Sequence, residues 1–484
     1  MVKSNKSKKR QNRKGKGPVR NPARSKKINA STPYDTCSEQ LSPFGGLLPL
    51  IKFFDLIGFR ESFNCAYKAP LRKPKLGHYK MVVGVLMLLF IGFNRIWHFS
   101  YLRLDAILCG FFKLTRLPVA STFWRYINSL GINQANALVR LMALMRQRAW
   151  QLCDLSYYRV CVDIDTTVET LFGSQQGGRK GHNTKNRGKK GYRPVLAFIQ
   201  QSREYLIGSL RKGETITGKE TAALIQKIKA CLPDCVKQVL IRADGEFQSW
   251  ESIQACILAG LDFIIANKRC NPVFDPEGWY QPQKRQPYQY NSCMYKPQGW
   301  DIPVRFVAMR IPIEAGAASD QSVQLALFED DRYKYRIFCT SVQRKAHEVI
   351  REYDKRADVE NLVGEAKREG LDAIPSSRFK SNYAFFQIVM LAYNIWRYMK
   401  ILAERSARST DASPEDQVLT GIRDNTVRIA RLRLLMISAK VVTVANRHKV
   451  RYSVQDSRTP GLFAFLKYLD IKRAQPKPWA VQMV

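Results

Sequence analysis

The segment from about residue 157 to 268 constrains the fold more than any other part of the sequence. Apolar and polar residues alternate there in short runs, and residues with helical spacing separate some of these runs. The predicted order is three strands, a helix, a strand, a helix and a strand, in the stretches YYRVCVDID, RPVLAFIQ, EYLIGSLR, GKETAALIQKIKACL, VKQVLIRA, FQSWESIQACILAG and LDFIIANK. Such an order predicts a mixed sheet covered by helices, an α/β arrangement.

Two of these predicted strands end in aspartates. Asp165 ends the first strand, with Asp163 two residues earlier, and Asp244 follows the strand at 236–243. Because alternate residues of a strand share a face, Asp163 and Asp165 point the same way and either can be the functional one. We favour Asp165, which lies nearer the strand end. A strand-end aspartate alone is more often a turn or helix-cap residue, but two that converge favour Mg²⁺ or Mn²⁺.

A third element is the predicted helix REYDKRADVENLVGEAK. Four of its residues fall within about 60° of each other on a helix with 100° per residue: Tyr353, Arg356, Glu360 and Lys367. The aliphatic side chains lie on the opposite side: Val359, Leu362, Val363 and Ala366. We expect the aliphatic face to be buried, and Glu360 is the only acid on the polar stripe. A solvated face with ion pairs would explain the charges, although not the tyrosine.

The charge of the chain indicates a polyanionic partner. Its 484 residues carry 79 Lys and Arg against 40 Asp and Glu, a net charge of +39. Twelve of these cations lie in residues 1–27, which contain no acid, so the rest keeps 39 − 12 = +27. Nucleic acid is the commonest partner of such a surface, and an anionic membrane or simple solubility are the alternatives. We expect residues 1–36 to be a disordered basic arm, either a nucleic-acid contact or a solubilising tail.

Cysteine usage and hydropathy bear on the compartment. The eleven cysteines are scattered, and only Cys231 and Cys235 lie close together, which is poor support for a zinc site. Reduced, buried thiols indicate a reducing compartment. The longest apolar run, 81–93, has 13 residues and is shorter than the roughly 20 that span a bilayer, so we expect a buried helix. No apolar segment of a secretion signal follows the basic N-terminus.

The spacing Y-x2-R-x3-E-x6-K, formed by Tyr353, Arg356, Glu360 and Lys367, resembles the signature of DDE transposases from bacterial insertion sequences. The resemblance is to the branch with a β-rich insertion before the final glutamate, and most closely to the insertion sequence 1380 family. Asp165 in VDIDTT and Asp244 in IRADGEF match the first two acids. STFWRYINS, FFQIVMLAYNIWRYM and RLRLLMISAKVV are also similar to that family, so the resemblance runs from about residue 40 onward.

The resemblance implies a fold and a domain order. The fold would be an α/β ribonuclease-H-like catalytic core with a β-rich insertion, preceded by an α-helical domain and followed by C-terminal helices. After the arm at 1–36, the expected parts are a helical DNA-binding domain at 37–150, the first part of the core at 155–269, the β-rich insertion at 270–346, the catalytic and following helices at 347–403, and a helical C-terminal region at 404–484. Within the last part, the spacing in RIARLRLLMISAKVV at 428–442 predicts one basic amphipathic helix.

The resemblance also implies a chemistry. Asp165, Asp244 and Glu360 would bind two Mg²⁺ ions, or Mn²⁺, cleave the DNA at the terminal inverted repeats, and join the 3′-hydroxyl ends to target DNA by strand transfer. Tyr353, Arg356 and Lys367 would hold the terminal phosphates. The partners would be double-stranded DNA and a second copy in a synaptic homodimer, with no membrane. The expected location is the cytoplasm of a prokaryote, on the nucleoid.

Further DNA contacts are predicted outside this signature. The basic segment 179–193 follows Asp165, and we expect its cations Lys185, Arg187, Lys189 and Lys190 to contact the DNA backbone. A solvated loop is the alternative. The resemblance implies that an insertion tryptophan stacks on a flipped base, with Trp279 and Trp300 as candidates; a core aromatic is the alternative. Two other functions remain open, a catalytically inactive DNA-binding regulator and a metal-dependent nuclease on the same fold.

Overall fold

The computed structural model describes residues 28–479, except 69–71, 182, 184–185, 284, 314–331 and 409–415. The chain divides into two units, Met1–Glu39 and Gln40–Val484. Most of the predicted basic arm lies outside the described residues, and residues 28–39 contain a turn but no helix or strand.

The first part of the second unit is helical, as predicted. α3 is its apolar centre, and every side chain from Met81 to Ile91 is buried, which confirms the prediction of a buried helix. The helices are α1 (Leu47–Leu56), α2 (Phe59–Ala66), α3 (Gly77–Ile91), η1 (Ile96–His98), α4 (Phe99–Leu102), α5 (Ala106–Phe112), α6 (Ala120–Ser129) and α7 (Ile132–Leu152). In the described part of the chain no single helix is long and apolar enough to span a membrane, and one bent pair, Gly77–Ile91 with Ile96–Leu102, reaches the criterion together.

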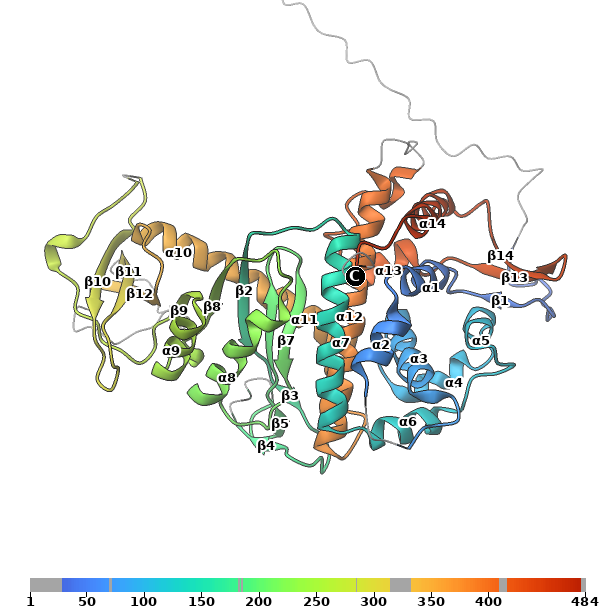
Figure 1. Ribbon diagram of the computed structural model, residues 1–484, viewed down its shortest axis with the longest axis horizontal. Coiled ribbons are helices and arrows are strands. Elements are labelled where there is room, and N and C mark those ends of the chain that lie inside the picture. The colour runs from blue at the N-terminus through green and yellow to red at the C-terminus, as the bar shows by residue number, and fades with distance from the viewer. Residues whose placement is uncertain are drawn as a thin grey trace, which may run out of the picture. The chain divides into compact units, whose positions relative to one another are not determined.

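A mixed sheet of eight strands organises the middle of the chain, in the order β10-β11-β12-β9-β8-β2-β6-β7 (Figure 1). The central strands β2 and β8 are parallel, and so are β8 and β9, whereas β6 and β7 run antiparallel to their neighbours. The predicted strands are confirmed with these bounds: β2 (Arg159–Thr166), β6 (Val195–Ile199), β7 (Glu204–Ser209), β8 (Gln238–Ala243) and β9 (Asp262–Ala266). The two predicted helices are α8 (Gly218–Ile228), followed by η2 (Lys229–Cys231), and α9 (Trp250–Ala259), which follows η3 (Gly245–Phe247).

The two faces of this sheet are buried in separate cores. Val160, Val162 and Ile164 of β2 belong to the large core shared with the N-terminal helices. Cys161, on the opposite face, belongs to a smaller core with Leu240 and with the apolar side of α10 (Ala346–Asp354). Because side chains alternate along a strand, Asp163 and Asp165 are on the face of Cys161, the face that α10 covers.

The predicted β-rich insertion contributes strands to this same sheet. β10 (Gln289–Tyr295), β11 (Val304–Pro312) and β12 (Tyr333–Thr340) form an antiparallel meander, after η4 (Pro276–Gly278). β12 then pairs antiparallel with β9 of the core, with Phe338 opposite Ala266 and Thr340 opposite Ile264. The segment is β-rich as predicted, and it extends the core sheet by hydrogen bonds.

The C-terminal part is only partly helical, which corrects the sequence-based expectation for 404–484. The predicted helix at 428–442 is wrong: α13 spans Val427–Leu434, and β13 (Ala439–Val444) and β14 (Arg447–Tyr452) form a hairpin before α14 (Thr459–Ala474). The β-branched run KVVTV favours a strand, and Ala445 and Asn446 both have positive φ, as a two-residue hairpin turn requires. β13 also pairs with β1 (Leu41–Ser42), so the start and end of this unit share one small sheet (Figure 1).

The segment with the signature is a series of short helices. α10 leads into η5 (Lys355–Ala357), α11 (Asp358–Ala366) and a π-helical turn, η6 (Lys367–Leu371). Residues 372–378 are not helical, because Gly370 with φ 123° ends the helical path, so a short non-helical link separates the catalytic and following helices expected within 347–403. α12 (Phe379–Ala407) is the long buried helix that follows, and η7 (Asp416–Leu419) comes after it.

Candidate active site

The parallel strands β2 and β8 bring the two strand-end aspartates together. Ile164 is opposite Ala243 in the register, so the next residues, Asp165 and Asp244, emerge side by side at the carboxyl ends. Burial raises the pKa of Asp165 to about 6, the nearby Arg356 guanidinium opposes this rise, and the charge of Asp244 adds to it. Burial likewise raises the pKa of Asp244, whose Oδ1 accepts a 2.9 Å hydrogen bond from the Glu246 amide. Two carboxylates thus repel each other in a partly buried place.

Asp163 lies on the same face but is already paired. Both of its carboxylate oxygens accept hydrogen bonds from Arg242, at 2.7 and 2.8 Å, and both side chains are almost fully buried. Arg242 also donates to the backbone oxygen of Glu352 at 2.6 Å, which ties β8 to α10. Asp163 therefore anchors the signature segment, whereas Asp165 has only one ion-pair partner in the described part of the chain.

Two residues of the signature face the aspartates. Arg356 on η5 donates from Nη2 to Asp165 Oδ1 at 3.1 Å and to the Ile164 carbonyl at 2.9 Å. Its Nε is buried and has no acceptor among the described residues. Tyr353 packs against Phe338 with ring centroids 4.4 Å apart. Burial raises the pKa of the Tyr353 hydroxyl, the Arg356 charge opposes this rise, and the charges of Asp244 and Asp165 add to it. Tyr353 therefore lies close enough to the two aspartates to feel their charge.

Glu360 is on the first turn of α11 and is exposed. The aliphatic face of this helix is buried, as predicted. The other acids of the segment form ion pairs with distant arginines: Asp354 with Arg336, Asp358 with Arg203, Glu365 with Arg397, and Glu369 with Arg431. In the described part of the chain Glu360 forms no salt bridge, and no three acidic, His or Cys side chains are grouped closely enough to hold a metal ion. The structure therefore brings Asp165 and Asp244 together. Glu360 is four residues after Arg356 in the sequence, but its carboxylate is not grouped with the two aspartates.

Lys367, the last signature residue, contacts the strand region that follows β2. Its Nζ donates to the Val168 carbonyl at 2.7 Å and lies 3.6 Å from Asp372 Oδ1. Glu169, next to Val168, has both carboxylate oxygens buried without a hydrogen-bond partner among the described residues. Burial and the charge of Asp372 raise the pKa of Glu169 well above its usual range, against the effect of Lys367. Lys367 therefore lies close to a buried carboxyl group whose pKa is raised.

Three residues of this region were not predicted from the sequence. Glu246 accepts a 2.6 Å hydrogen bond from Arg193 and a 3.0 Å hydrogen bond from the hydroxyl of Thr166, the residue after Asp165. These two bonds fix the ends of β2 and β8 relative to each other. The signal available was the acid two residues after Asp244 in ADGEF, but its partner Arg193 is 53 residues away in sequence.

The predicted basic segment forms a small sheet of its own. β3 (Glu169–Thr170), β5 (Lys190–Tyr192) and β4 (Arg179–Lys180) pair in the order β3-β5-β4. Arg187, Lys189 and Lys190 are exposed on it, whereas Lys185 lies outside the described residues. β3 follows β2 directly, and the hydrogen bond from Lys367 to Val168, just before β3, connects this small sheet to the end of the signature segment.

Trp279 and Trp300 lie in the strands and turns of the insertion. Trp300 is 9% exposed and packs against Trp250, with ring centroids 5.6 Å apart. Trp279 is half-buried, and the guanidinium of Arg310 lies 4.1 Å above its ring. Both tryptophans are packed by neighbouring side chains, and stacking on a DNA base stays a prediction for each.

The donor set fits a hard divalent cation in its chemistry. Asp165 and Asp244 offer carboxylate oxygens, which Mg²⁺ and Mn²⁺ prefer. Burial, and to a smaller extent the charge of Asp244, raises the pKa of Asp165, and a cation between the two carboxylates would offset both effects. Glu360 offers a third carboxylate, which forms no ion pair with the described residues, unlike Asp358 and Glu365.

One comparison with known proteins shows the family of this chain. The family described as Transposase DDE domain group 1 matches residues 24–470. Among solved structures, a piggyBac transposase synaptic complex with hairpin DNA is similar over 90% of this chain and 82% of that chain, with 10% identity and a TM-score of 0.36. No curated protein matches. Because the family match covers nearly the whole length, the chain belongs to the DDE transposases of group 1.

Proposed function

We propose that this protein is the transposase of a bacterial insertion sequence, most similar to the insertion sequence 1380 family. It would bind the terminal inverted repeats, cleave the DNA ends and join the 3′-hydroxyl ends to target DNA. One observation carries the proposal: Asp165 and Asp244 emerge side by side from parallel strands, under Arg356 and Tyr353 of the signature segment. These are the positions at which the family signature requires acids and phosphate-binding groups.

The strand arrangement supports a ribonuclease-H-like core. Numbered along the chain, the core strands β2, β6, β7, β8 and β9 lie in the order 3-2-1-4-5, with the first three antiparallel. The first strand is central, so its carboxyl end and that of the fourth strand meet, as they would in that fold. The proposal follows from this topology and from family membership together.

Asp165, Asp244 and Glu360 are the proposed ligands of two Mg²⁺ or Mn²⁺ ions. When bound, the two ions would activate the attacking hydroxyl and stabilise the leaving oxygen of the phosphodiester. Asp163 is the weaker choice for the first ligand, because Arg242 occupies both of its oxygens. Glu360 would reach the aspartates from an exposed position on the first turn of α11.

The other signature residues would bind and orient the DNA end. Arg356 has a buried Nε–H with no acceptor among the described residues, so an incoming phosphate oxygen would satisfy it. Tyr353 and Lys367 would position neighbouring phosphates, with the Lys367 ammonium already oriented by the Val168 carbonyl. The exposed cations Arg187, Lys189 and Lys190 would contact the DNA backbone, and the same role is proposed for Lys185, which lies outside the described residues.

Assembly and location follow from the proposed reaction. Two transposon ends must be held together for strand transfer, so we expect a synaptic homodimer on double-stranded DNA. The net charge of +39 supports a polyanionic partner, and the proposed location is the cytoplasm of a prokaryote, on the nucleoid.

A cleavage and strand-transfer assay tests the proposal. Labelled DNA taken from the ends that flank the gene is incubated with the protein and Mg²⁺, and the wild type is compared with Glu360→Gln. Glu348→Gln is the matched control, since Glu348 is also an exposed acid of the same helical segment. We expect cleavage and joining in the wild type and in the control, and loss of both in Glu360→Gln.

Other results distinguish the alternatives. Binding without cleavage by the wild type would indicate an inactive regulator, and cleavage without joining would indicate a nuclease. Activity that survives in Glu360→Gln would show that the third acid is assigned to the wrong residue.

A further inference from the structure

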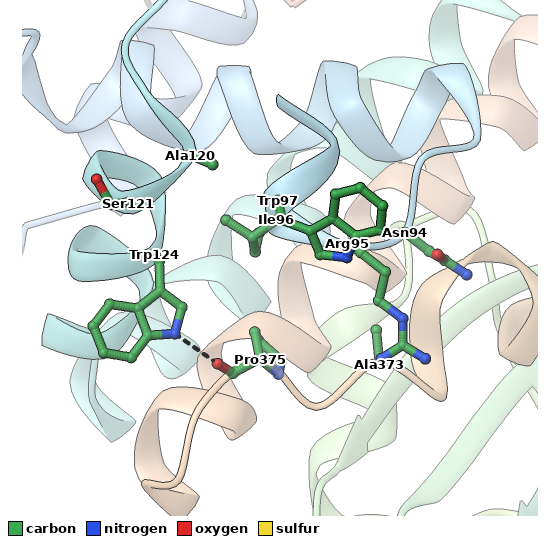
Figure 2. A pocket seen from close by; sticks show the side chains of 9 residues that line it. All are labelled: Asn94, Arg95, Ile96, Trp97, Ala120, Ser121, Trp124, Ala373 and Pro375. Atoms are coloured by element: carbon green, nitrogen blue, oxygen red, sulfur yellow. Dashed lines mark hydrogen bonds between the residues drawn. The ribbon is translucent and has the colours of Figure 1, made fainter. Parts of the chain in front are cut away.

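A cavity of about 430 Å³ opens between the N-terminal helices and the segment that follows the signature (Figure 2). Its volume is within the range of about 300–1,000 Å³ that is typical of ligand sites. Arg95, Ile96 and Trp97 lie on one side, Ser121 and Trp124 on the other, and Pro375 lies between them (Figure 2). Nothing in the proposed catalytic chemistry uses this cavity.

The two indole rings are unusually accessible for tryptophans. Trp97 is 56% exposed and Trp124 is 44% exposed, whereas most large aromatics of this helical region are buried. Trp124 donates from Nε1 to the Pro375 carbonyl at 2.9 Å, which fixes its ring plane and leaves much of the ring accessible (Figure 2). Trp97 is held edge-on by His98 and Tyr101, with ring centroids 4.3 and 5.6 Å away. Rings that are fixed before binding lose little entropy when a flat ligand stacks on them.

The charge around the cavity selects the class of ligand. Arg95 is the charged residue among those that line it in the described part of the chain. Residues 94–129 hold a single acid, Asp105, which is buried and caps α5. The same stretch carries five cations: Arg95, Arg103, Lys113, Arg116 and Arg125. A second copy of this chain would present the same positive face and be repelled, whereas a polyanion with flat rings is attracted.

The cavity is connected to the signature segment by a short length of chain. Lys367 and Ala373, which lines the cavity, are six residues apart, so their Cα atoms are separated by at most about 20 Å. Gly370 between them packs closely, because a Cβ built there would lie 3.0 Å from Leu89 and 3.5 Å from Asn94 beside the cavity. A DNA strand that contacts Lys367 therefore needs at most about six nucleotides to reach the wall of the cavity.

We propose that this cavity binds an unpaired nucleobase of the DNA strand held at the candidate active site, stacked against Trp97 and Trp124. The inference rests on the proposed function only in taking DNA as the ligand. The base would stack on the indoles and Arg95 would neutralise the adjoining phosphate. This site is separate from Trp279 and Trp300, which belong to the insertion strands and turns.

The test compares binding of a labelled 15-nucleotide oligothymidine with that of an abasic oligomer of equal length and charge. Loss of one stacked base corresponds to about a 5- to 150-fold weaker affinity. We expect the wild type to prefer the oligothymidine by a factor in that range, and the double variant Trp97→Ala/Trp124→Ala to lose the preference. Trp97→Phe keeps an aromatic face and should retain most of it. Tyr158→Ala is the matched control, since Tyr158 is 65% exposed and does not line the cavity.

A second variant covers the case in which the double variant does not fold. Ser121→Phe keeps both indoles and fills the cavity from an exposed position, so it should abolish the preference as well. Equal binding of the two oligomers by the wild type, or an unchanged preference in both cavity variants, would overturn the proposal. So would a change in sedimentation of the variants with no change in base preference, because the face would then be an interface between copies.

The cleavage assay separates this inference from the proposed function. Glu360-dependent cleavage without any base preference would refute the cavity alone. Base preference without Glu360-dependent cleavage would leave the nucleobase site in place and refute the proposed transposition chemistry.

Discussion

Replacement of Asp163 by Asn separates a structural carboxylate from a catalytic one. Asp163 and Arg242 form a two-point ion pair with side-chain exposures of 2% and 0%. Removal of Asp163 leaves the buried Arg242 guanidinium with only the longer, 3.8 Å ion pair to Glu352, and breaking a buried pair in this way typically costs about 3–5 kcal/mol. Unfolding entropy is roughly 2.1 cal/mol/K per residue, and the folded unit spans Gln40–Val484, so the expected decrease in Tm is roughly 3–5 °C. Asp165→Asn should lower the Tm less than Asp163→Asn, because the single 3.1 Å contact with Arg356 that it weakens is offset by relief of the repulsion from Asp244.

Thermal unfolding followed by circular dichroism measures the difference, with DNA cleavage assayed on the same preparations. The double variant Asp163→Asn/Arg242→Leu should unfold at a higher temperature than Asp163→Asn alone, since no unpaired charge remains. A decrease of less than about 1 °C in Asp163→Asn would refute the reasoning. If Asp165→Asn retained full cleavage while a well-folded Asp163→Asn lost it, the assignment of the first metal ligand would be reversed.

Three further predictions concern other parts of the chain. The exposed cations of the basic sheet are Arg187, Lys189 and Lys190, and we expect their replacement with Ala to weaken the salt dependence of DNA binding. In DNA-binding titrations, the slope of log K against log salt should decrease in magnitude by about 0.9 for each DNA phosphate that the variant no longer binds. An unchanged slope would argue for a solvated loop. Burial lowers the pKa of Lys400 from 10.5 to about 7, so the unfolded chain binds more protons between these values and stability rises with pH there. Between pH 7 and 9 this contributes about 2 kcal/mol to the free energy of unfolding in urea, and Lys400→Met should lack that increment. Gly370→Ala should destabilise the fold by about 1–3 kcal/mol in the same assay, because φ is 123° and the Cβ would meet Leu89; a wild-type midpoint would contradict this.

Local patterns predicted most elements of the core because each depends on its own residues. Alternation identified β2 and β8, and the position of Asp244 after β8 followed from the length of the apolar run. The buried aliphatic face of α11 followed from helical spacing alone. Pairing between strands was not predictable in this way, since β12 meets β9 across about 70 residues and nothing in either strand specifies its neighbour.

The site was predictable to a similar degree. The predicted strand ends located Asp165 and Asp244. The ion pair that distinguishes Asp163 from Asp165 was not predictable, because alternation along β8 does not show which acid Arg242 pairs with. Helix α13 is shorter than the helix predicted for 428–442. RIARLRLL continues smoothly into a β-branched run, and the change to a strand is decided by pairing with β1, nearly 400 residues earlier.

The packing of α3 against α12 has a consequence for how the chain is made. Phe90 stacks on Trp396 at 4.0 Å, and the Phe90 carbonyl accepts hydrogen bonds from Trp396 and Arg431. About 300 residues separate these partners, so a ribosome adding 5–20 residues per second leaves the side of α3 that packs on α12 uncovered for roughly 15–60 s. A chain that ends before α12 would keep this apolar side of α3 exposed, even with the N-terminal helices folded around the rest of it.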